Sequence, residues 1–167
     1  VVGDSTPAVL HYQCSSHGYM GNAVTNDSSV VNTNYDTRFG GFLKESVTVT
    51  AGKLSDNTNI DLSNGNLFLF TTAETTTSTP NLRYDGSTSL NSKMAIGEAI
   101  SVTIVTTAAA AGYSAQLTID GGAVTENWTG GSAPSDGGSS GVDVYAYTIM
   151  KTADATFTVI ATQTKTS

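Results

Sequence analysis

The stretch Ala99–Thr107 (AISVTIVTT) constrains the fold of this chain more than any other part of the sequence. β-Branched residues fill nearly every position, and Ile100, Val102 and Ile104 alternate with Ser101, Thr103 and Val105. This two-residue period predicts a β-strand with one face in a hydrophobic core.

Several other stretches have the same character, and each is bounded by Gly, Asn, Asp or Ser clusters. They are Val47–Ala51, Asn66–Thr72, Ser114–Asp120, Val142–Met150 and Ala155–Thr162, with shorter candidates at Pro7–Gln13, Asn81–Tyr84 and Val124–Trp128. Asn64–Gly65 is a strong hairpin signal, and Ser87–Gly97 has room for one turn of helix. Many short strands joined by polar turns predict an all-β chain that is a β-sandwich or a barrel. Of these we expect an antiparallel, jelly-roll-like β-sandwich.

We divide the chain into three parts. Residues 1–25 are interpreted as the end of another sandwich, residues 26–44 as a linker rich in turn formers, and residues 45–167 as the β-sandwich domain. The first part is expected to be the tail of a larger domain, or to dock onto another subunit.

Charge and composition exclude several function classes. The net charge is −7, and the seven Lys and Arg residues are scattered singly, so we expect no nucleic-acid binding. No apolar run approaches the length of a membrane span, so no membrane contact is expected. Cys14 is the only cysteine, and no disulfide can form within this sequence.

Cys14, His17 and Met20 form a C-x2-H-x2-M pattern after the predicted strand Pro7–Gln13. The pattern resembles the C-terminal ligand loop of the cupredoxins, small blue-copper electron carriers, and thiolate, imidazole and thioether are ligands that suit copper. A blue-copper site needs a second histidine. The one other histidine, His11, is an odd number of residues from Cys14, so their side chains should face opposite sides of a strand.

We therefore interpret the copper half-site as vestigial and expect no copper or other cofactor. Two alternatives remain open. The missing ligand lies in another segment or a neighbouring chain, or Cys14 and Met20 pack in a core beneath a glycine-rich loop.

The sequence carries no recognisable catalytic constellation. Both histidines lie within the first 17 residues, so residues 45–167 lack a histidine base, and no phosphate-binding, dinucleotide-binding or metalloprotease motif occurs. Asp120 and Asp136 flank the loop around Trp128, where a cation site or an acid–base pair is one interpretation and turn formation the favoured one. We expect the chain not to be an enzyme.

Aromatic residues supply the remaining candidate site. Trp128, the single tryptophan, precedes Gly130–Gly131. It has two interpretations: a stacking platform for a sugar ring, or, as we favour, a plug at the end of the sandwich. Tyr145 and Tyr147 share one strand face, either in a subunit interface or in half-exposed sheet packing.

Two sets of segments resemble the structural and tail-fibre proteins of marine tailed bacteriophages. One is Ser5–Thr25 (STPAVLHYQCSSHGYMGNAVT). The other comprises NIDLSNGNLFLF, AISVTIV, NWTGGSAP and VDVYAYTIM. The chain departs from that pattern at Met150–Gln163, where the family has a glycine-rich turn and a tryptophan. The resemblance implies an extracellular virion appendage that is commonly a homotrimer.

The predicted function is therefore a non-enzymatic virion structural protein, a fibre or decoration appendage of a tailed phage. It would serve assembly with itself and other virion proteins, or contact with a host-surface glycan. The alternatives are a secreted copper electron carrier using Cys14, His17 and Met20, and a bacterial carbohydrate-binding adhesin module using Trp128.

Overall fold

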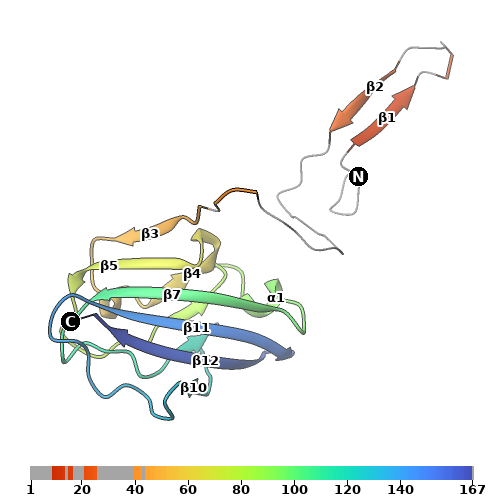
Figure 1. The fold of residues 1–167 in the computed structure, drawn as a ribbon. Coiled ribbons are helices and arrows are strands. Elements are labelled where there is room, and N and C mark those ends of the chain that lie inside the picture. Colours follow the sequence, from red (N-terminus) through yellow and green to blue (C-terminus); the bar gives the residue numbers. More distant parts are fainter. Residues whose placement is uncertain (1–8, 14, 17–20, 26–39, 43, 167) are drawn as a thin grey trace. The chain divides into compact units, whose positions relative to one another are not determined.

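The chain divides into two compact units, Val1–Leu43 and Lys44–Ser167. The structure, a computed structural model, describes residues 9–13, 15–16, 21–25, 40–42 and 44–166 (Figure 1). In the first unit, β1 (Val9–Gln13) pairs antiparallel with β2 (Gly21–Thr25). The predicted strand at Pro7–Gln13 is thus confirmed over residues 9–13.

The second unit is almost entirely β, which confirms the predicted all-β class. Its larger sheet contains β3 (Val47–Thr50), β5 (Leu67–Ala73), β7 (Ala99–Thr107), β10 (Glu126–Trp128), β11 (Val142–Ala153) and β12 (Thr156–Lys165). Its smaller sheet contains β4 (Asn59–Asp61), β6 (Asn81–Arg83), β8 (Thr118–Ile119) and β9 (Gly122–Ala123). The helical elements among the described residues are α1 (Leu90–Lys93) and the 3-10 turns η1 (Leu54–Asp56) and η2 (Leu62–Asn64).

The first six strands of the second unit alternate between the two sheets. The larger sheet has the order β10-β12-β11-β7-β5-β3 (Figure 1), and the smaller has the order β4-β6-β8-β9. Strands β3, β5 and β7 are mutually parallel, as are β4, β6 and β8. Each parallel connection in one sheet therefore passes through a strand of the other, and successive passes stack as coils do in a β-helix.

The predicted antiparallel, jelly-roll-like pairing is wrong for this part of the chain. Both sheets are mixed, with antiparallel pairing between β7, β11 and β12 and between β8 and β9, and parallel pairing elsewhere. The hairpin predicted at Asn64–Gly65 is also wrong. Gly65, with a φ of 114°, ends η2, and the chain passes there from β4 in the smaller sheet to β5 in the larger one.

Side chains stacked along the smaller sheet hold its parallel strands in register. Inward, Ile60, Leu82 and Ile119 occupy aligned positions and are buried. Outward, the Asn81 amide nitrogen donates to Asn59 Oδ1 at 2.9 Å, and the Thr118 hydroxyl donates to Asn81 Oδ1 at 3.0 Å. A slip of one residue would expose the aliphatic row and break this polar row, so both rows favour one register.

One hydrophobic core lies between the sheets. It takes Ile60, Leu82 and Ile119 from the smaller sheet, and Phe68, Phe70, Val102, Ile104, Tyr145, Tyr147, Ile149, Val159 and Ala161 from the larger one. The inward face predicted for β7 is confirmed, since Val102 and Ile104 are buried. Among the described residues, no helix has the length and apolar character that crossing a membrane requires.

Tyr145 and Tyr147 are core residues, each 1% exposed, so neither half-exposed packing nor a subunit interface describes them. The Tyr145 hydroxyl accepts from Ser114 N at 3.2 Å and from the Gln163 side chain at 3.0 Å. The Tyr147 hydroxyl is buried and has no hydrogen-bond partner among the described residues. These neighbours on one strand face thus differ in whether their hydroxyls are satisfied.

This difference predicts opposite effects of the same substitution. Tyr147→Phe removes an unpaired buried hydroxyl and is expected to stabilise the protein by about 1 kcal/mol. Tyr145→Phe leaves Ser114 N unpaired and is expected to cost about 1–2 kcal/mol. Urea denaturation of both variants followed by circular dichroism measures the two free energies of unfolding. Equal losses in the free energy of unfolding of the two variants would contradict the assignment of hydrogen bonds to the Tyr145 hydroxyl alone.

The same two tyrosines predict loss of stability in alkali. Burial raises the pKa of Tyr145 to about 12, and burial raises the pKa of Tyr147 further. The tyrosines of the unfolded chain lose their protons near pH 10, whereas the buried ones keep theirs to higher pH. The contribution of the two protonated tyrosines to the free energy of unfolding is therefore complete below pH 10 and falls as the pH rises toward 12. Unfolding midpoints measured from pH 8 to pH 12, beside tyrosinate absorbance, check this. A constant midpoint up to pH 12 would refute it.

Candidate functional site

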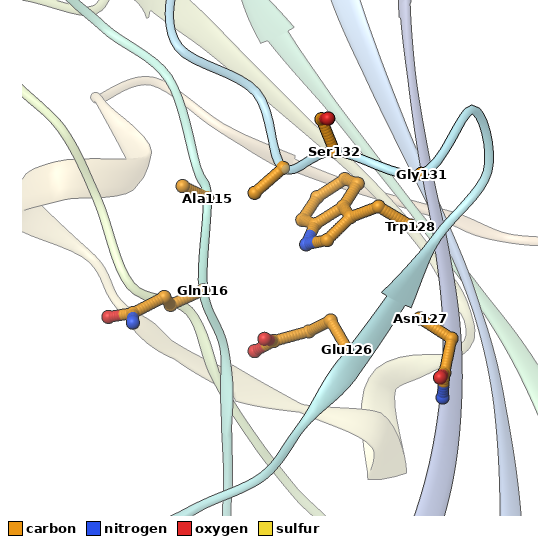
Figure 2. Close-up of a pocket in the computed structure, with 8 residues that line it drawn as sticks. Ala115, Gln116, Glu126, Asn127, Trp128, Gly131 and Ser132 are labelled. Atoms are coloured by element: carbon orange, nitrogen blue, oxygen red, sulfur yellow. The ribbon is translucent and has the colours of Figure 1, made fainter.

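A pocket of about 520 Å³ opens between β10 and the segment Ala115–Gln116 that precedes β8. In Figure 2, Trp128 and Glu126 lie on one side of this space, and Ala115 and Gln116 lie on the other. Its volume falls within the range of about 300–1,000 Å³ that is typical of small-molecule sites.

Backbone pairing fixes Trp128 at the wall of this pocket. Strand β10 pairs in parallel with β12, where Trp128 aligns with Ala161, and Thr129 N donates to Ala161 O at 2.8 Å. The chain then turns at Gly130 and Gly131, whose φ angles of 91° and 84° favour glycine, and Gly131 N donates to Trp128 O at 3.0 Å. Strand pairing and the turn that follows it therefore hold the backbone at Trp128.

The indole of Trp128 is half-buried and packs against the core. Its ring meets that of Tyr147 edge to face, with centroids 6.4 Å apart and an angle of 72° between the planes. The indole nitrogen is buried without a hydrogen-bond partner among the described residues. An unpaired buried donor costs about 1–3 kcal/mol, so this nitrogen gains from any acceptor that reaches it. Trp128, on the edge strand β10, therefore packs against the core and lines a pocket at the same time.

Glu126 places a carboxylate beside the tryptophan. Its Oε1 accepts a hydrogen bond from Leu117 N at 2.6 Å, while Oε2 accepts none from any residue that the structure describes. Its charge is one of the causes that raise the pKa of Tyr147, after burial and Tyr145. Glu126 thus reaches from β10 to the opposite wall of the pocket, and its Oε2 can accept a hydrogen bond from a molecule bound there.

The two aspartates singled out near the Trp128 loop have structural partners instead. Asp120 accepts from Leu90 N at 2.7 Å and from Asn91 N at 2.9 Å, which fixes the start of α1. Asp136 forms an ion pair with Lys165 at 2.7 Å. The two carboxylates thus bind different segments, Asp120 the start of α1 and Asp136 a lysine on β12.

The cupredoxin-like ligand set lies outside the described residues, because Cys14, His17 and Met20 all belong to the undescribed part between β1 and β2. The candidate second histidine, His11, aligns with Ala23 in the β1–β2 pair. Within the described part of the chain, no three His, Cys, Asp or Glu side chains are grouped to hold a metal ion. The vestigial interpretation stays a prediction.

Of the pocket residues, sequence reasoning selected Trp128 and missed Glu126 and Gln116. A signal for Glu126 existed: positions two apart on a strand share a face, so Glu126 follows once Trp128 is placed on β10. No such signal existed for Gln116, which comes from a different segment.

Comparisons of this chain with protein-family models, with curated proteins and with solved structures found no match.

Proposed function

We propose that this chain is a non-enzymatic structural protein of a tailed-phage virion, a segment of a fibre or decoration appendage. Its second unit, residues 44–167, serves assembly with copies of itself and with other virion proteins, or contact with the host surface. The observation that carries the proposal is the stack of parallel passes β3–β8, closed against the antiparallel strands β11 and β12.

This architecture suits an extracellular appendage for a physical reason. The strands of the stack pair with one another in two sheets, and buried charged side chains of the second unit bond to backbone groups. Lys151, for example, donates to Asn91 O and to Met94 O at 2.9 Å, and Asp143 accepts from Gly138 N. Such a framework holds loops rigidly and leaves few segments open to proteases.

The experiment that tests the proposal locates the protein. Antibodies against residues 44–166 are applied to purified virions of a phage that encodes this chain and imaged by immunogold electron microscopy. Labelling of fibres, tails or capsids supports the proposal, and sedimentation of the full chain is expected to give a trimer. Absence from virions, with the protein found only in the host cell, would overturn it.

A second candidate, a carbohydrate-binding adhesin module, is favoured by one specific observation. The pocket beside Trp128 combines an aromatic ring with carboxylate and amide groups, the side chains that bind sugars in many sites. Labelling on the surface of bacteria instead of virions would favour this candidate.

A further inference from the structure

We infer that the Trp128 pocket binds a neutral pyranose, through an aromatic platform and the polar side chains Glu126 and Gln116. This inference rests on the surface-contact role proposed above and gives it a ligand class. The source of the sugar, a polysaccharide on a cell or a free saccharide, is distinguished by the experiment below.

The platform is the indole of Trp128. Its ring is half-buried and its edge contact with Tyr147 holds its orientation, so little side-chain freedom is lost on binding. The face of an aromatic ring carries a negative quadrupole, which attracts the positively polarised C–H bonds on the flat side of a pyranose. Small residues leave the space beside the ring open: Ala115 and Ala133 line it, and a Cβ added at Gly131 would meet nothing within 4 Å.

The polar groups suit hydroxyl groups. Glu126 Oε2 accepts no hydrogen bond from the described residues, so it can accept from a sugar hydroxyl. Gln116 is exposed on the opposite wall and offers both a donor and an acceptor. Groups on two facing walls fix the orientation of a ring between them, which a single stacking residue does not.

Charge decides which sugars fit. The lining residues include one carboxylate and no lysine or arginine, and the whole chain carries a net charge of −7. An acidic sugar would bring its carboxylate toward Glu126 without a compensating cation. The site therefore selects neutral hexoses or N-acetylhexosamines over sialic and uronic acids.

The single tryptophan makes the test direct, because all indole emission of the full chain comes from Trp128. The protein is titrated with methyl glycosides of glucose, galactose, mannose and N-acetylglucosamine, with glucuronic acid, and with neutral polysaccharides. A saturable change in emission with at least one neutral sugar, and a weaker or absent change with glucuronic acid, is expected. Tighter binding of polysaccharide than of its monomer identifies a surface polymer as the source.

Two variants connect the signal to the pocket. Glu126→Gln keeps an oxygen for Leu117 N, and Gln116→Ala changes an exposed side chain, so both are expected to fold. Each is expected to weaken binding by about tenfold, while Glu45→Gln, an exposed carboxylate next to β3, serves as the matched control and changes nothing.

Three outcomes overturn the inference: no emission change with any neutral sugar, tighter binding of glucuronic acid, or equal binding by Gln116→Ala and Glu45→Gln variants. Virion labelling without a sugar response would remove this site and leave the proposed function standing. A sugar response without virion labelling would remove the proposed virion function and leave the sugar site standing.

Discussion

Replacing Gly112 with alanine is expected to destabilise the second unit by about 3 kcal/mol or more, or to prevent folding. A Cβ at position 112 would lie 2.1 Å from Glu74 Cβ and 3.0 Å from the Glu74 carbonyl carbon. Gly112 is buried and is not one of the glycines with a positive φ, so the cost comes from overlap and not from backbone strain. Because the overlapping atoms belong to the backbone and to its first side-chain atom, rotation of a side chain cannot relieve the clash.

Gly86→Ala is the matched control for this prediction. A Cβ there would meet Arg83 Nη2 at 3.7 Å, an ordinary contact, and this glycine also lacks a positive φ. Its effect on the free energy of unfolding is expected to stay within about 0.5 kcal/mol. Urea denaturation of both variants, followed by the emission of Trp128, gives the comparison. Similar stability of the two variants would show that the 74 and 112 backbones do not touch.

Removing the Glu74 carboxylate has the second largest expected effect. Glu74 is 2% exposed, and its two oxygens accept hydrogen bonds from Leu54 N and, at 3.3 Å, from Ser55 N in η1. Glu74→Ala leaves both backbone donors without their acceptors in a buried place, with a cavity beside them. The expected loss in the free energy of unfolding is about 3 kcal/mol.

Glu74→Gln separates the contribution of packing from that of hydrogen bonding. Its amide fills the same space and keeps one oxygen that can accept from Leu54 N. We expect a loss of about 1 kcal/mol for this variant. Hydrogen exchange of the Leu54 and Ser55 amides adds a local measurement: both should exchange faster in Glu74→Ala than in Glu74→Gln. Identical losses in the two variants would mean that packing, and not hydrogen bonding, is what Glu74 supplies.

Both predictions concern one end of the sandwich, where polar side chains are buried and glycines lie in close contact with neighbouring backbone. Asp143 lies there fully buried, and both of its oxygens accept from Gly138 N. A Cβ at Gly137 would lie 2.2 Å from Ala109 O. The loop at 132–141 is therefore held in place where Gly137 and Gly138 are buried. This order matters for function, because Ser132 and Ala133 in the same loop line the Trp128 pocket.

Part of the candidate site was accessible from the sequence. Trp128 stood out as the single tryptophan beside two glycines, and the structure places it at a pocket. Gln116 reaches that pocket from a segment predicted to be strand throughout Ser114–Asp120, although only Thr118–Ile119 forms β8. Residues before β8 are held instead by side chains, since the Ser114 hydroxyl bonds that of Ser78 at 2.7 Å. Contacts between distant segments replaced strand pairing there.

The sequence by itself determined where most strands run and, for β7, which face is buried, but it did not place the Tyr145–Tyr147 face of β11 in the core. The predicted strand Ala99–Thr107 coincides with β7, and the turn of helix expected within Ser87–Gly97 is α1, which Ser89 caps by accepting from Ser92 N. Alternation is a local property: it depends only on the two-residue period of the extended chain, so neighbouring residues suffice to reveal it.

Only the tertiary structure decided how the strands pair. A strand with one buried face has the same two-residue hydrophobic period whether its neighbour is parallel or antiparallel. The hydrophobic pattern therefore does not show that successive strands of this chain belong to different sheets. Asn64–Gly65 has the composition of a hairpin, yet β4 and β5 separate there because their apolar faces cover the core from opposite sheets. Pairing is fixed by contacts between residues far apart in the sequence, and those contacts exist only once the core has formed.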